Sequence, residues 1–202
     1  FRMDLASDPL AQLRAYDSGL PLLVTNRVDW EGGGTPDTRK RLDDLATAIE
    51  LPHVEAVDLE FDALEEGTAG HVRDHARKHG VSVVVSAHDF EATPDPDRLR
   101  TLLQSACGYG DVGKVAVTAD SPGDVLDVLD VTWELTSAGE TVATMAMGEA
   151  GRHSRAVAPL YGSAIGYAPV NPSEVTAPGQ YDLATLSSLV DQLAGDSPSA
   201  EV

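Results

Sequence analysis

Lysine is rare in this chain, and one of its three lysines lies inside an apolar run. Lys114 is followed by Val115, Ala116 and Val117, where a charged side chain is costly unless it is paired or functional. Burial or neighbouring cations would lower its pKa from about 10.4 and leave a neutral amine that can attack a carbonyl carbon. The setting therefore suggests a nucleophilic lysine. The competing interpretation is a lysine that only extends from a strand edge into solvent.

Polar side chains also gather at the carboxyl ends of predicted strands, where parallel α/β folds place their sites. They are Arg27, Glu31, His88, Arg155, Thr176 and Gln180. The set contains a histidine that can act as a base, a carboxylate that can orient it, and two arginines suited to a carboxylate ligand. Each residue alone has a plainer interpretation, as a structural histidine, a solvated acid or a surface ion pair. Together they favour an active site.

Apolar strand-like runs alternate with helical segments along the whole chain. The predicted strands cover residues 20–27, 56–61, 81–90, 114–119, 141–147 and 164–170. The predicted helices cover residues 38–49, 68–79, 95–107, 121–138, 154–161 and 183–193. Strict alternation of this kind indicates a parallel sheet covered by helices, because parallel strands need a crossover connection.

The α/β pattern allows two architectures, and we prefer a (β/α)8 TIM barrel over a doubly wound open sheet. No glycine-rich dinucleotide fingerprint follows a strand, and the three glycines at 32–34 lack the spacing and the lysine of a phosphate loop. A barrel typically has about 250 residues, so we expect the first strand and part of the second to be missing from this chain of 202. Residues 1–194 are predicted to form one barrel domain, and residues 195–202 a polar tail.

The charge balance is strongly acidic. There are 33 Asp and Glu residues against 14 Lys and Arg, for a formal net charge of −19. A nucleic-acid partner is disfavoured, because a phosphate backbone needs a basic surface. The acids are spread along the chain, so adaptation to a salty cytoplasm is preferred over a surface for a cationic partner. No run reaches the roughly 18 apolar residues of a membrane span, and the single Cys107 excludes internal disulfides.

Two further groups of titratable residues receive no role. His71, His75 and His79 recur every four residues and could bind a metal, but the basic residues between them mark an exposed helix face. We therefore prefer a solvated face and expect no metal. Asp58 and Glu60 alternate with apolar residues in a strand, and at least one of these acids is expected to point into the barrel.

At these residues the chain resembles type I 3-dehydroquinate dehydratase, an enzyme of the shikimate pathway. The segments that carry the resemblance are Glu31-Gly32-Gly33, Val85-Ser86-Ala87-His88-Asp89-Phe90, Gly113-Lys114-Val115-Ala116-Val117, Met145-Ala146-Met147, Ser154-Arg155, Tyr161-Gly162-Ser163 and Ala177-Pro178-Gly179-Gln180. Each segment is weak alone, but their order along nearly the whole chain is highly specific. The resemblance implies a (β/α)8 barrel without metal or organic cofactor, acting as a homodimer in the cytoplasm on 3-dehydroquinate.

The resemblance also implies an elimination of water through an imine. Lys114 matches the lysine that forms a Schiff base with the C3 ketone of 3-dehydroquinate. His88 matches the general base that removes the C2 proton, and Glu31 the carboxylate that positions this histidine. The residues matched to substrate contacts are Arg2, Arg27, Arg155, Thr176 and Gln180. The family often has serine at the place of Thr176, and the hydroxyl is kept.

Two other functions fit part of the sequence. Another class I Schiff-base enzyme, such as an aldolase, would also use Lys114, but no clear phosphate loop lies near the last two predicted strands. An inactive acidic binding domain would show no turnover even at molar salt. The preferred prediction is a hydro-lyase that binds neither nucleic acid nor membrane.

Overall fold

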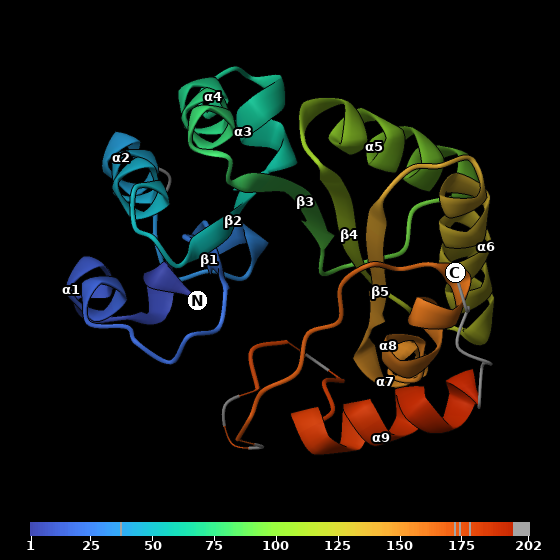
Figure 1. Ribbon diagram of the computed structural model, residues 1–202. Coiled ribbons are helices and arrows are strands. Elements are labelled where there is room, and N and C mark those ends of the chain that lie inside the picture. Colours follow the sequence, from blue (N-terminus) through green and yellow to red (C-terminus); the bar gives the residue numbers. More distant parts are fainter. Residues whose placement is uncertain (37, 172, 174, 178, 196–202) are drawn as a thin grey trace, which may run out of the picture. The chain divides into compact units, whose positions relative to one another are not determined.

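The computed structural model describes residues 1–36, 38–171, 173, 175–177 and 179–195 (Figure 1). These residues form two compact units. The first consists of Phe1–His88 and Leu103–Lys114, and the second of Asp89–Leu102 and the chain from Val115 onward. Each unit is described by itself.

Parallel strands follow one another in chain order, as the sequence predicts. The strands are β1 (Leu22–Thr25), β2 (Val54–Glu60), β3 (Ser82–Asp89), β4 (Val112–Thr118) and β5 (Val142–Met147). Their order in the sheet is β1-β2-β3-β4-β5, and the β1–β2 and β2–β3 pairs are parallel. Arg2 forms an isolated parallel bridge with Thr25. The predicted α/β class is confirmed.

In the first unit, two amphipathic helices pack against each other and cover the strands. The helical elements are η1 (Met3–Leu5), α1 (Pro9–Arg14), η2 (Asp29–Glu31), α2 (Arg39–Ile49), α3 (Phe61–Glu65) and α4 (Gly70–His79). The Thr38 side chain caps the start of α2 by accepting from the Arg41 amide. Gly80 ends α4 in the left-handed conformation at φ +71°. Figure 1 shows α2 and α4 side by side, and residues of the two helices are in contact.

In the second unit, α6 packs against β5. The helical elements are α5 (Pro96–Tyr109), whose last turns belong to the first unit, α6 (Pro122–Ser137), α7 (Gly148–Gly151), α8 (Ser154–Val157), η3 (Ala158–Tyr161) and α9 (Leu183–Ala194). A capping box between Ser121 and Asp124 starts α6, with Pro122 in its first turn. The core on this side contains Val125, Leu129 and Ala146.

The strand predicted over residues 164–170 is wrong, because the described backbone there forms no regular element. Two backbone amides of β5 donate hydrogen bonds to side-chain hydroxyls instead of to the carbonyls of a neighbouring strand. The Thr144 amide donates to Ser163 Oγ at 2.9 Å, and the Ala146 amide donates to Ser154 Oγ at 3.0 Å. The Ala164 amide still donates to the Val142 carbonyl at 2.8 Å, but with the Thr144 and Ala146 amides satisfied by hydroxyls the segment continues without forming a strand.

Several short helices, α1, α3, α7 and η2, were not expected, since apolar periodicity needs a longer window to be recognised. Residues 196–202 of the predicted polar tail lie outside the described residues. A single barrel domain over residues 1–194 stays a prediction. Among the residues described, no helix combines the length and apolar character needed to cross a membrane.

Candidate active site

Lys114 is buried, with an exposed fraction of 5%, and strands β2 and β3 each bring one side chain to it. Its Nζ lies 3.2 Å from Asp58 Oδ2 on β2 and 3.3 Å from His88 Nε2 on β3. Strand β4 begins at Val112, two residues before the lysine, which explains how an amine at the start of the apolar run reaches the site. The predicted pairing of Lys114 with His88 is therefore present in the structure.

Glu31 reaches the other nitrogen of the same imidazole. Its Oε2 lies 2.7 Å from His88 Nδ1. Two glycines shape the turn that presents it. Gly32 ends η2 at φ +74°, and a Cβ added to Gly33 would lie 2.0 Å from the Arg27 carbonyl oxygen. Only glycine fits both positions, which gives the Glu31-Gly32-Gly33 segment a structural reason.

Arg27 is buried among three carboxylates. Its guanidinium lies 3.2 Å from Glu31, 2.5 Å from Asp58 and 3.1 Å from Glu60. Glu60 is held in turn by Arg41 at 2.8 Å. Arg27 therefore organises the acids around the lysine and the histidine, and its expected contact with substrate stays a prediction.

The sequence alone suggests no role for Asp58 and Glu60, and the structure places both in this cluster. Each is 2% exposed, and that at least one of these acids points into the barrel stays a prediction. The only signal in the sequence was a pair of acids inside an apolar strand.

Arg2 lies beside the turn that carries Glu31. Its Nη2 donates to the Gly32 carbonyl at 3.2 Å, and its Nε donates to Asp4 Oδ1 at 2.8 Å. The same Asp4 oxygen accepts from the Arg27 amide at 3.1 Å. Arg2 thus supports the turn through Asp4, while its expected contact with substrate stays a prediction.

The remaining predicted residues belong to the second unit. Arg155 on α8 is buried beside Met145 and lines a small pocket with Ser163 and Tyr167. Gln180 is the last residue of the segment 177–180, which carries part of the family resemblance. Its Oε1 accepts hydrogen bonds from the amides of Thr176 at 2.9 Å and Ala177 at 3.3 Å. The structure brings Thr176 and Gln180 into contact with each other. The binding of substrate by Arg155, Thr176 and Gln180 stays a prediction.

The cluster favours the neutral forms of the lysine and the histidine. Burial lowers the pKa of Lys114 below 10.5, although Asp58 opposes this shift. Burial, then the charges of Lys114 and Arg27, lower the pKa of His88 well below 6.5. Near neutral pH the imidazole of His88 is therefore neutral and can accept a proton. The amine of Lys114 loses its proton more easily than that of an exposed lysine.

The pKa values of Glu31 and Asp58, which contact His88 and Lys114, are shifted in opposite directions. Burial raises the pKa of Glu31 to about 8, although Arg27 opposes it, so this carboxylate is unusually basic. Burial would also raise the pKa of Asp58, but Arg27 and Lys114 outweigh burial and hold that pKa below 3.8. Above its pKa of about 8, Glu31 is ionised and accepts a hydrogen bond from an Nδ1–H of His88. That tautomer leaves the Nε2 lone pair directed at Lys114.

We expect Asp58→Asn to lower the free energy of unfolding by about 3–5 kcal/mol, because it leaves part of a buried charge network unpaired. The folded-state pKa of Asp58 is depressed, so its contribution is present above the unfolded pKa of about 3.9 and is lost as pH falls through the folded value. Denaturant unfolding at pH 7, where the contribution is present, and at pH 3, where part of it is lost, measures it. A gap between wild type and variant that widens toward acid would contradict the assignment.

A buried lysine next to a histidine–carboxylate pair, carried by parallel strands of an α/β fold, defines an enzyme that works through an imine. Residues 2–197 match the sequence model of the family described as Type I 3-dehydroquinase. The 3-dehydroquinate dehydratase of Haloarcula marismortui is 62% identical over 199 residues, covering 97% of this chain and 87% of that protein. The enzyme of the same name from Halobacterium salinarum is 54% identical over 196 residues, covering 96% and 87%.

Solved structures agree with the sequence comparison. The crystal structure of 3-dehydroquinate dehydratase from Geobacillus kaustophilus is 31% identical, with a TM-score of 0.77, covering 88% of this chain and 69% of that one. The type I enzyme of Clostridium difficile, solved with covalently modified comenic acid, is 29% identical, with a TM-score of 0.79, covering 92% and 73%. The chain therefore belongs to the type I 3-dehydroquinase family. The predicted family and its (β/α)8 barrel fold class are confirmed.

Proposed function

We propose that this protein is a hydro-lyase of the shikimate pathway, which eliminates water from 3-dehydroquinate to give 3-dehydroshikimate through a Schiff base on Lys114. The proposal rests above all on one observation, the buried Lys114 amine 3.3 Å from His88 Nε2. The names of the relatives support the substrate, because several curated proteins similar to this chain are 3-dehydroquinate dehydratases. Neither an aldolase nor an inactive binding domain has comparable support.

The first step forms the imine. The neutral Lys114 amine adds to the C3 carbonyl, and the carbinolamine loses water to leave a protonated Schiff base. The lowered pKa of Lys114 favours the attacking form. The positive charge that then stays on the nitrogen lies beside the carboxylate of Asp58, whose depressed pKa keeps it ionised.

The second step is the elimination itself. His88 Nε2 takes the C2 proton, and the electron pair moves into the imine to give an enamine. As the enamine collapses, the C1 hydroxyl leaves and takes the proton from the imidazolium, so that water departs. Glu31 holds Nδ1 throughout and stabilises the imidazolium. Addition of a second water to the imine releases the product and restores the Lys114 amine.

The remaining residues bind and orient the substrate in this proposal. Arg155 is assigned to the substrate carboxylate, since a guanidinium can bind both oxygens at once. The residues proposed as further contacts are Arg2, Arg27, Thr176 and Gln180.

Borohydride trapping tests the mechanism. Reduction of the imine in the presence of 3-dehydroquinate should add the mass of the reduced ligand to the peptide that contains Lys114. The chain offers a built-in control, because its other lysines, Lys40 and Lys78, are exposed. An active sample in high salt that shows no adduct on Lys114, or shows it equally on Lys78, rejects the Schiff base.

Salt should stabilise the fold, as expected for a halophilic protein. The net charge of −19 makes the acidic groups repel one another in dilute buffer, and added ions screen that repulsion. The relatives from Haloarcula marismortui and Halobacterium salinarum agree with this view. We expect the melting temperature to rise from low to molar KCl. A melting temperature that falls over this range would remove the halophilic interpretation.

We also propose that the enzyme is a cytoplasmic homodimer. Support comes from α6, where Leu126 and Trp133 are exposed two helical turns apart and thus lie on one face. Sedimentation in molar KCl should give the mass of a dimer for wild type and of a monomer for Trp133→Glu. A wild-type monomer at micromolar concentration would contradict the dimer.

A further inference from the structure

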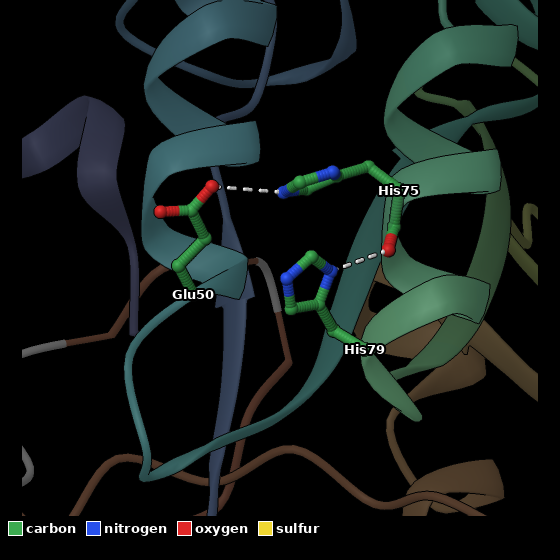
Figure 2. Close-up of side chains that lie close together, drawn as sticks. All are labelled: Glu50, His75 and His79. Carbon is green, nitrogen blue, oxygen red and sulfur yellow. Dashed lines mark hydrogen bonds and ion pairs between the residues drawn. The ribbon is translucent and has the colours of Figure 1, made fainter.

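We propose that the first unit carries a transition-metal site, best suited to Zn²⁺, formed by Glu50, His75 and His79. His75 and His79 are one turn apart on α4, and Glu50 comes from the end of α2 (Figure 2). Candidate ligand atoms of the three residues all lie within 4.8 Å of one another. None of these residues belongs to the Lys114 cluster, so the site is separate from the proposed catalytic machinery.

The spacing of Glu50 and His75 already fits a tetrahedral zinc ion. His75 Nε2 lies 3.3 Å from Glu50 Oε1. Two ligands at about 2.0–2.1 Å from a tetrahedral centre are about 3.3–3.4 Å apart. This contact is an ion pair, marked by a dashed line in Figure 2, and within the described part of the chain the buried Nε2 of His75 forms no hydrogen bond. A cation held between the two atoms would satisfy both.

His79 is oriented as a metal-binding histidine is. Its Nδ1 lies 3.0 Å from the backbone carbonyl oxygen of His75, as Figure 2 shows. A carbonyl only accepts hydrogen bonds, so Nδ1 carries the proton and Nε2 carries the lone pair. Donation of the second ring N–H to a backbone carbonyl is the usual support of a ligating imidazole. Both Glu50 and His79 are exposed, so a small rotation of either side chain can close the site.

His71, the third histidine of α4, is not part of the proposed metal site. His71 lies one turn earlier on α4, where its Nε2 is 3.8 Å from Asp43 and its Nδ1 contacts the Thr68 carbonyl. The expectation of a solvated face fits His71. It does not fit His75, which is half-buried with its ring centroid 4.2 Å from that of His79.

The donor set determines the class of ion. Two imidazoles and one carboxylate are typical of zinc, and of cobalt, nickel or copper in their divalent states, whereas magnesium and calcium prefer oxygen alone. Water would complete the coordination. Such an ion would link the end of α2 to α4 and stabilise the packing of these two helices. The acidic surface raises the local concentration of cations and favours binding.

Zinc titration of the metal-free full-length chain, in molar KCl and against a chromogenic chelator, tests the proposal. We expect one equivalent to bind to wild type and to His71→Ala, the matched control. His75→Ala, and His79→Ala at an exposed position, should each weaken binding at least about tenfold. Bound Co²⁺ should show the intense visible bands of a tetrahedral site.

The melting temperature gives a second measurement that is independent of activity. Zinc should raise it in wild type and His71→Ala but not in the double variant His75→Ala/His79→Ala. Failure of wild type to bind one equivalent, or equal affinity in the double variant, overturns the proposal.

Discussion

Lys114→Ala should lower kcat on the order of 10⁶-fold, as the loss of other covalent nucleophiles does. Without the amine no imine forms, and the C2 proton loses the electron sink that acidifies it. His88 and Glu31 alone can then act only on an unactivated ketone. Borohydride should trap no adduct in this variant. The ultraviolet absorbance of the conjugated enone in the product measures the rate.

Lys114→Arg separates the nucleophile from its charge. Arginine keeps a cation near Asp58, which lies 3.2 Å from the lysine nitrogen, but it offers no amine for an imine. We therefore expect a loss of turnover similar to that of the alanine variant. Lys78→Ala, on the exposed face of α4, is the control that should keep wild-type activity. Turnover by Lys114→Arg above one hundredth of the wild-type rate would show that the amine is not the nucleophile.

His88→Ala should lower kcat by about 10²–10⁴-fold, the usual contribution of a general base. It should not prevent imine formation on Lys114, so borohydride still traps the adduct. Slow elimination with retained trapping separates the two steps. Loss of trapping together with turnover would mean that His88 acts in forming the imine rather than in proton removal.

The pH dependence of the wild-type enzyme follows from the same two groups. His88 must be unprotonated to act, so kcat falls as pH drops through its pKa, and burial places that acid limb below pH 6.5. The free enzyme also needs a neutral Lys114, so kcat/KM has a further acid limb, which lies below 10.5. Glu31→Gln should weaken the hold on Nδ1 and lower kcat by less than His88→Ala does. Ionisation of Glu31, whose pKa burial raises to about 8, can add a second acid limb, which Glu31→Gln should remove. An acid limb of kcat above pH 7 that remains in Glu31→Gln would contradict the assignment to His88.

Motif spacing was enough to find the central residues of the candidate site. Lys114 stood out as a charge inside an apolar strand, and His88 and Glu31 as polar groups at strand ends. The structure confirms that the three lie together. Local rules suffice for His88 and Glu31 because parallel strands bring their carboxyl ends to one edge whatever the details of packing. Lys114, near the start of β4, was found only as a charge inside an apolar run.

Asp58 and Glu60 show what local rules miss. Residues from Val57 to Glu60 are all buried, so alternation along β2 does not tell which side chains meet. Their partners, Arg27, Arg41 and Lys114, are 19 to 56 residues distant in sequence. The register of the strands and the approach of α2 determine which charges pair.

The sequence by itself determined the α/β class, most strands and helices, and the lysine, histidine and carboxylate on which the proposed chemistry depends. The tertiary structure alone decided the network of Arg27, the loss of the strand expected at 164–170, and the meeting of Glu50 with two histidines of α4. Periodicity and motifs are local properties of the chain. Hydrogen bonds and ion pairs between distant segments depend on packing, which no local pattern encodes.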